Sequence, residues 1–136
     1  MAPPTPGHLC SPRRGAAVAE LAICLPLLVM LVLASIEACS MMFLNHSLTI
    51  ASYEGVRVAI NYDSTNADVH ARCDEIIAER NVVGGGVVIS RSNVMTVPKG
   101  TPISVTVSAS CDANALLPPW FYGGQTMTAS TTMVKE

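Results

Sequence analysis

The stretch "RRGAAVAELAICLPLLVMLV", residues 13–32, decides how this chain is built. Two arginines precede a run of small and apolar residues in which Glu20 is the one charged side chain. No charge occurs from Leu21 to Ile36, and counting back to Ala16 gives twenty-one residues. Because about 20 apolar residues cross the hydrocarbon core of a bilayer, the sequence predicts one transmembrane helix over residues 16–37.

The composition supports a membrane protein with a small external part. Hydrophobic residues make up 50% of the 136 residues and charged residues only 13%, a balance that favours a membrane segment. The net charge of −2 gives no electrostatic case for nucleic-acid binding. After Arg14 no Lys or Arg occurs until Arg57, so the positive-inside rule predicts a cytoplasmic N-terminus and an external remainder. A signal peptide cut after Ala38, which would release a secreted protein, remains an alternative.

The segments on either side of the predicted span differ in character. Residues 1–15 hold four prolines within the first twelve positions, which disfavour a helix and predict a flexible leader. Residues 38–62 continue the helical pattern beyond the membrane as an amphipathic extension. The residues that recur there at spacings of three and four are Phe43, Ser47, Ile50, Glu54, Arg57 and Val58. In this run Glu54 and Arg57 are three apart and can pair on the helix surface.

Residues 63–136 predict a small external α+β domain. Thr65 with Asp68 resembles a capping box and opens a second helix over residues 67–81. We expect its apolar face to consist of Val69, Cys73, Ile76 and Ile77, and its end to be the glycine triplet at residues 84–86. Three stretches then alternate like strands, so the fold class is α+β with an antiparallel sheet of about three strands. They are residues 86–90, 102–110 and 126–134, with an apolar loop, "LLPPWFYGG", expected to fold over the sheet edge.

The cysteines and histidines indicate a structural rather than a catalytic role. Cys73 and Cys111 lie in the predicted external part, where two cysteines suggest one disulfide, with two separate buried thiols as the alternative. His46 and His70 are best interpreted as helix-surface residues, and no nucleophile and base lie in a recognisable arrangement. No spacing of ligands predicts a metal, and nothing predicts a cofactor. The sequence therefore gives no reason to expect an enzyme.

The stretch "RRGAAVAELAICLP" resembles the N-terminus of TadE-like proteins, the minor pseudopilins of the Tad (Flp, type IVb) pilus system. The resemblance implies that Arg13 and Arg14 are the basic residues of a leader that a prepilin peptidase removes. Cleavage would follow Gly15, which makes Ala16 the first mature residue and Glu20 the fifth. Leu21 departs from the phenylalanine that is usual in the family, but it keeps the position apolar.

A second similarity follows the predicted span. The stretch "ASYEGVRVAI" is similar to the glutamate-glycine-x-arginine motif of the family, carried here by Glu54, Gly55 and Arg57. The resemblance covers residues 13 to about 60, and the C-terminal half has no diagnostic motif. It also implies a role for Glu20, whose carboxylate would neutralise the new amine of Ala16, on its own chain or on a neighbouring subunit.

The resemblance implies a function, a location and partners. The chain would be a TadE-like minor pseudopilin that acts in Tad pilus assembly from the cytoplasmic (inner) membrane, with its C-terminal domain outside. Its partners would be the prepilin peptidase, other pilins or pseudopilins, the inner-membrane assembly platform and the lipid bilayer. Whether it enters the fibre or only primes assembly stays open. The alternative is a single-pass membrane-anchored domain that binds an external ligand or partner and has no pilus role.

Overall fold

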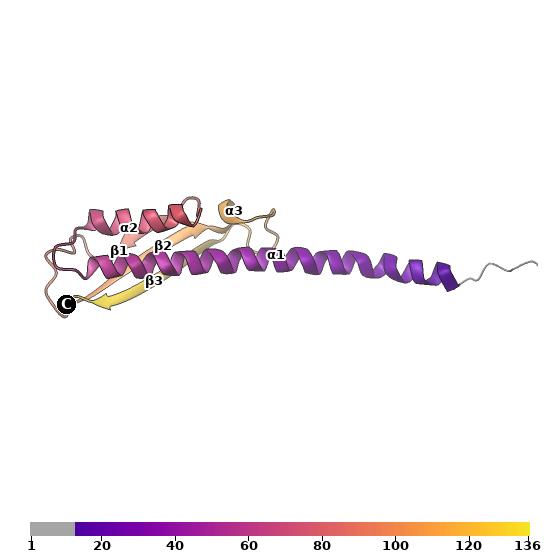
Figure 1. Ribbon diagram of the computed structural model, residues 1–136, viewed down its shortest axis with the longest axis horizontal. Coiled ribbons are helices and arrows are strands. Elements are labelled where there is room, and N and C mark those ends of the chain that lie inside the picture. The colour runs from indigo at the N-terminus through magenta and orange to yellow at the C-terminus, as the bar shows by residue number, and fades with distance from the viewer. Residues whose placement is uncertain (1–12) are drawn as a thin grey trace, which may run out of the picture. The chain divides into compact units, whose positions relative to one another are not determined.

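The computed structural model of this protein describes residues 13–136, and its side chains from Gly15 onward (Figure 1). The described chain forms two compact units, one that ends at Ser35 and one that runs from Ile36 to Glu136. Its elements are α1 (Arg13–Ala59), α2 (Asn66–Glu79), β1 (Gly86–Ile89), β2 (Pro102–Ser110), α3 (Cys111–Asn114) and β3 (Thr126–Val134). The predicted α+β class, with a long apolar N-terminal helix, a second helix and a three-stranded antiparallel sheet, is confirmed.

The N-terminal unit consists of the first part of α1, whose apolar side chains are exposed. Among the described residues, α1 is the one helix long and apolar enough to cross a membrane, and its most apolar window is not buried at all. The helix begins at Arg13, three residues before the expected start, because Pro12 is the last helix-breaking residue of the leader. It passes through Pro26 without ending. The prediction of a flexible leader over residues 1–15 is therefore wrong for residues 13–15, which are helical, and residues 1–12 lie outside the described residues.

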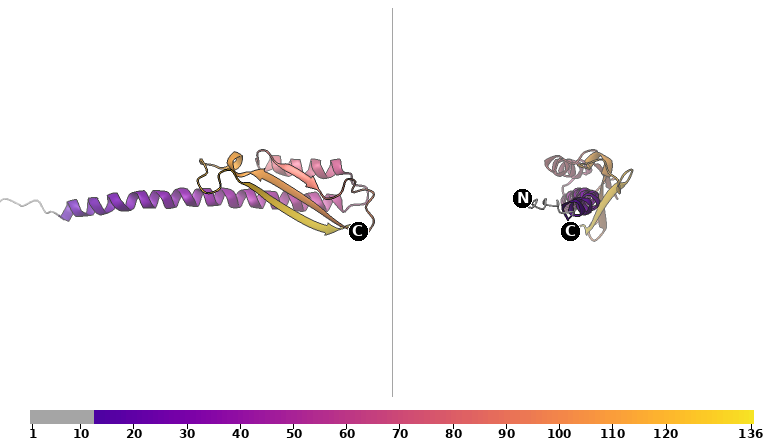
Figure 2. Two further views of the ribbon diagram at one scale, coloured as in Figure 1. Left: turned by 180° about the vertical axis from the view of Figure 1, so that it is seen from behind. Right: turned by 90° about the vertical axis from the view of Figure 1, so that its right-hand side faces the viewer.

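The C-terminal unit is a sheet covered on one face by two helices. The strands follow the order β1-β2-β3, and both pairs are antiparallel, with Val107 of β2 opposite Val87 of β1 and Ala129 of β3. Figure 2 shows α2 and residues 36–59 of α1 on the same side of this sheet. The strand boundaries match those that the alternation of the sequence predicts, apart from one residue at the end of β1.

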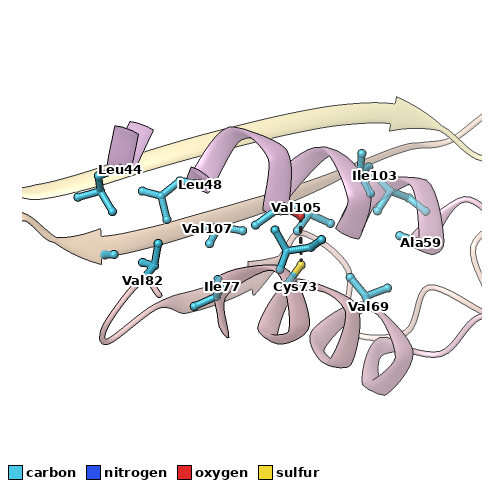
Figure 3. Close-up of a cluster of buried hydrophobic side chains, with 14 of the residues drawn as sticks. Leu44, Leu48, Ala59, Val69, Cys73, Ile77, Val82, Ile103, Val105 and Val107 are labelled. Atoms are coloured by element: carbon cyan, nitrogen blue, oxygen red, sulfur yellow. Dashed lines mark hydrogen bonds between the residues drawn. The ribbon is translucent and has the colours of Figure 1, made fainter. Parts of the chain in front are cut away.

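The two faces of β2 separate the core from the solvent. The core face carries Ile103, Val105 and Val107, which Figure 3 labels, together with Ala109, and all four are buried. On the other face hydroxyl groups pair across the strands, with Ser104 Oγ 2.6 Å from Thr132 Oγ1 and Thr106 Oγ1 2.9 Å from Ser130 Oγ. This division follows from the period of two in a strand, which sends successive side chains to opposite faces.

The buried side of α1 differs from the amphipathic face that the sequence predicted. Phe43 and Arg57 are exposed, and Ile50, Glu54 and Val58 are only partly buried. Of the predicted residues only Ser47 is buried, and the other buried side chains of this part of α1 are Met41, Leu44, Leu48, Ala51, Ser52, Val56 and Ala59. Many of these are small, since α1 packs closely against both α2 and the sheet, and spacing alone does not reveal which small residues lie in such a seam.

Helix α2 has the predicted start and a different end. Thr65 and Asp68 form the capping box, in which the Asp68 carboxylate accepts from the Thr65 backbone N–H at 2.8 Å. These hydrogen bonds from Thr65 hold the pKa of Asp68 below its ordinary value. The helix ends at Glu79 and is closed by Asn81 in the left-handed conformation (φ 53°), with the Val82 N–H bonded to the Ile77 carbonyl. Asn81 therefore does what the sequence assigned to the glycine triplet, because asparagine also tolerates this conformation.

Candidate functional site

The candidate site is the seam between α1 and α2, where the predicted motif of Glu54, Gly55 and Arg57 lies. Gly55 faces the buried side chain of Cys73 on α2, and a Cβ atom at position 55 would overlap the Cys73 Sγ. The same Cβ would stand 3.2 Å from Val105 Cγ1 of β2. Gly55 thus marks the point where α1 approaches both α2 and the sheet so closely that a larger residue does not fit.

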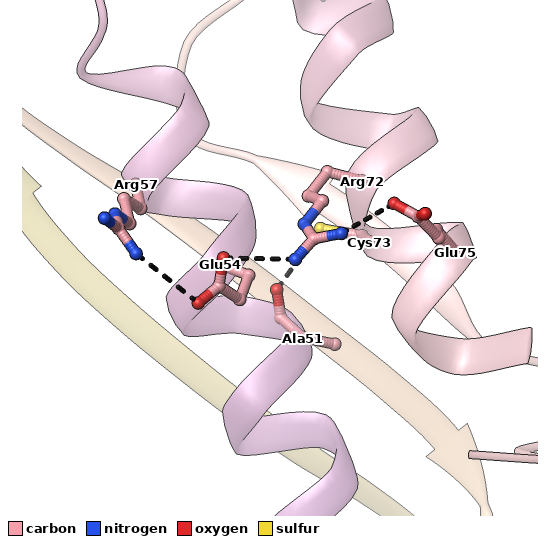
Figure 4. Close-up of polar contacts among 6 residues, drawn as sticks. All are labelled: Ala51, Glu54, Arg57, Arg72, Cys73 and Glu75. Carbon is pink, nitrogen blue, oxygen red and sulfur yellow. Dashed lines mark hydrogen bonds and ion pairs between the residues drawn. The ribbon is translucent and has the colours of Figure 1, made fainter. Parts of the chain in front are cut away.

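Glu54 joins the two helices on the rim of this seam (Figure 4). Its carboxylate lies 3.9 Å from Arg57 Nη1 on α1 and 3.4 Å from Arg72 Nη2 on α2. Arg72 also donates to Glu75 at 2.7 Å, and this hydrogen bond, together with the one to Glu54 and the negative charge of both carboxylates, raises the pKa of its guanidinium. The predicted pair of Glu54 and Arg57 is present, while Arg72 was missed because it is distant in sequence. Exposed ion pairs contribute little stability, so this cluster adds little to the free energy of unfolding.

The structure corrects the predicted disulfide between Cys73 and Cys111, since both residues are free thiols. The Cys73 thiol donates to the Ala51 carbonyl at 3.4 Å beside Val105, whereas Cys111 follows the last residue of β2. The strand from Val105 to Ser110 alone spans about 17 Å at the usual rise, and a disulfide requires Cα atoms less than about 7 Å apart. The alternative of two separate buried thiols is therefore correct.

Burial makes both thiols poor nucleophiles. Desolvation raises the pKa of Cys73 to about 11, and the nearby Asp74 carboxylate adds to this effect. Burial also raises the pKa of Cys111, with a smaller contribution from Asp112, although a backbone hydrogen bond from Met127 opposes it. Neither residue has the lowered pKa and the exposure of a reactive cysteine.

Thiol labelling should distinguish the buried cysteines from Cys39, which is exposed. In the native full-length protein at about pH 8, we expect maleimide to modify Cys39 at least about 100-fold faster than Cys73 or Cys111. Peptide mass spectrometry after timed quenching would measure the three rates. After denaturation without reductant, Cys73 and Cys111 should both react. If both stayed unmodified until a reductant was added, the free-thiol arrangement would be wrong.

The residues of the predicted processing site lie in the N-terminal unit. Gly15 is within the first turns of α1 with no atom near the position of its missing Cβ, and Ala16 and Glu20 are exposed. Ala16 and Glu20 are four residues apart in this helix, so they share one face one turn apart. Because helical side chains lean towards the N-terminus, the Glu20 carboxylate extends towards Ala16. Arg13 and Arg14 form the start of the helix.

Sequence reasoning missed two buried charged side chains in the C-terminal unit. Lys135 is only 4% exposed, and its Nζ donates to the carbonyls of Asn61, Val94 and Ala59 at 2.9, 3.0 and 3.3 Å. Glu37 is 7% exposed and accepts from the backbone N–H groups of a loop near the end of the chain. For Glu37 the only signal in the sequence was a charge beside an apolar run. Such a signal does not identify a hydrogen-bond partner so distant along the chain.

Within residues 13–136, no group of three or more His, Cys, Asp or Glu side chains is placed to hold a metal ion. The described buried polar side chains all have hydrogen-bond partners, so none is left to orient a ligand. The arrangement is that of a packing seam between α1, α2 and the sheet.

The family model described as TadE-like protein matches residues 15–57. The match begins at Gly15 and ends at Arg57, so it includes Glu20 and the motif at the α1–α2 seam, and it leaves the strands outside. No curated protein and no solved structure matches the chain. Residues 15–57, about a third of this chain, are therefore similar to the TadE-like family, in agreement with the resemblance that the sequence carries.

Proposed function

We propose that this protein is a TadE-like minor pseudopilin that acts in the assembly of a Tad (Flp, type IVb) pilus. In this proposal a prepilin peptidase removes residues 1–15, residues 16–37 span the inner membrane, and residues 38–62 continue the helix outside. Residues 63–136 complete the external domain. The other partners are pilins or pseudopilins, the assembly platform and the bilayer.

One observation carries the proposal, namely that the TadE-like match begins at the residue where cleavage is expected. From Gly15 onward the match first covers an apolar stretch of α1 that the rest of the chain does not bury and that needs an apolar surrounding. Glu20 is the one charged residue between Gly15 and Ile36, and it lies one turn from the backbone nitrogen of Ala16. Cleavage would turn that nitrogen into an ammonium group, which a carboxylate at this distance can neutralise.

The first test is whether a Tad prepilin peptidase cleaves the chain. Co-expression with the peptidase should give a membrane-extracted protein that begins at Ala16, as intact mass and N-terminal sequencing would show. Gly15→Leu should abolish the cleavage, while Ala22→Leu, a comparable enlargement at an exposed position of the same helix, should leave it intact. A wild-type chain that keeps residues 1–15 beside an active peptidase would contradict the proposal and favour the plain membrane anchor.

The role proposed for Glu20 predicts a coupling between this residue and the cleavage. In the cleaved protein, Glu20→Gln should lower co-purification with the major pilin by about tenfold or more, because the new ammonium group is left without its carboxylate in the membrane. In the uncleaved Gly15→Leu protein the same substitution should change little, since no ammonium group has formed there. Quantitative pull-down from membranes would measure both. Equal effects of Glu20→Gln in the two backgrounds would refute the pairing.

A further inference from the structure

The loop between α3 and β3 exposes large apolar side chains that the fold does not use. Leu116, Trp120 and Phe121 are 80%, 72% and 65% exposed, and residues 115–124 contain no charged side chain. Such a surface is costly in water. Tyr122, in contrast, packs partly against the core and holds one side of the loop to the domain.

Glu37 fixes the backbone of this loop. One of its carboxylate oxygens, Oε1, accepts from the N–H groups of Phe121 and Tyr122 at 2.9 and 3.0 Å. At the far end of the loop, the Asp112 carboxylate accepts from the Gly124 N–H at 2.9 Å. Two carboxylates therefore hold the loop in one conformation, in which Trp120 and Phe121 stay exposed.

The position of Glu37 in the chain indicates what the exposed apolar side chains of this loop would contact. Glu37 directly follows Ile36, the last residue of the uncharged apolar run. Any residue that is hydrogen-bonded to the Glu37 side chain must therefore lie within a few ångströms of the end of that run. If the run spans the hydrocarbon core, the loop lies at the boundary between hydrocarbon and headgroups, the depth at which tryptophan and other aromatic side chains are enriched in membrane proteins.

We infer that residues 116–122 form a membrane-interface anchor, which inserts Leu116, Trp120 and Phe121 into the boundary region of the bilayer that α1 crosses. The inference rests on the membrane anchoring within the proposed function, but not on cleavage or on a pilus. The anchor would add a second contact with the membrane and would fix the distance of the external domain from its surface.

Trp120 provides the test, because it is the only tryptophan of the chain. The full-length protein would be reconstituted in phosphatidylcholine vesicles brominated either near the headgroup end or near the methyl end of the acyl chains. We expect Trp120 emission to be blue-shifted, and the shallow bromines to quench it at least about twofold more than the deep ones. Emission as in water, without quenching by either lipid, would overturn the inference.

A second probe separates a failure of this inference from a failure of α1 to insert into the membrane. Cys24 lies within the apolar part of α1 and is exposed, so a bimane label there, with Cys10 and Cys39 changed to serine, reports insertion of the helix. A quenched bimane with an unquenched Trp120 would overturn the inference about the loop and leave the insertion of α1 into the membrane unaffected. An unquenched bimane would overturn both. A quenched bimane, with Trp120 shielded only when a pilin is added, would assign the surface to a protein partner instead.

Variants test the contribution of the side chains themselves. Leu116→Ser together with Phe121→Ser should reduce the quenching of Trp120 by about half or more, because two of three inserted side chains become polar. Val88→Ser on β1 is the matched control, since this apolar side chain is 64% exposed and distant in sequence from the loop. Glu37→Leu should also reduce the quenching, because it frees the loop backbone. Equal quenching in all three variants would contradict the role assigned to the loop.

Discussion

Gly55→Ala should destabilise the C-terminal unit by about 2 kcal/mol. The added Cβ would overlap the Sγ atom of Cys73, which belongs to a short and fully buried side chain and not to the far end of a flexible one. Overpacking of a core costs about 1–3 kcal/mol, and this overlap belongs at the upper end. The higher helix propensity of alanine returns about 1 kcal/mol. Chemical unfolding of the full-length protein in nanodiscs, followed by circular dichroism, would measure the difference.

Removal of the sulfur should reverse this result. Cys73→Ala alone should cost about 1 kcal/mol, because it leaves a small cavity. In that background Gly55→Ala should be neutral or stabilising, since the new methyl group occupies the space of the lost sulfur. Gly86→Ala is the control, as its Cβ would meet Ser108 Oγ at an ordinary 3.4 Å. If Gly55→Ala lowered the free energy of unfolding by the same amount in the wild-type and Cys73→Ala backgrounds, the contact between position 55 and the Cys73 Sγ would not limit how closely α1 approaches α2.

Lys135→Met should destabilise the same unit by about 3 kcal/mol. Methionine keeps the apolar stem but removes the three hydrogen bonds from Nζ to the carbonyls of Ala59, Asn61 and Val94. Two of these carbonyls lie at the C-terminal end of α1, where the helix dipole favours a positive charge. Hydrogen bonds to a charged group contribute about 1.5–3 kcal/mol each, and water can replace part of them.

Lys99→Met is the matched control for this substitution, because it makes the same chemical change at a lysine whose side chain is exposed. Its effect on the free energy of unfolding should stay within about 0.5 kcal/mol. Both variants would be unfolded under the same conditions as the wild-type protein. A loss of the same size in Lys99→Met and Lys135→Met would show that the buried ammonium group is not what holds these segments together.

The sequence determined the features that depend on neighbours along the chain. The alternation of residues 102–110 was enough to place β2 and its core face, because a strand has a period of two whatever it pairs with. The capping box of Thr65 and Asp68 was readable for the same reason, since both partners lie within four residues. The apolar run and the spacing of Gly15 and Glu20 likewise sufficed for the TadE-like resemblance, which the family match then confirmed.

Only the tertiary structure decided the contacts between segments that are distant in sequence. It joined Glu37 to residues 121 and 122, placed Lys135 on the end of α1, and set Cys73 against Gly55 rather than against Cys111. The predicted disulfide failed because two cysteines in one domain carry no information about the distance between them. The physical reason is general: local periodicity fixes which face of an element is apolar, whereas the packing of elements fixes which atoms meet.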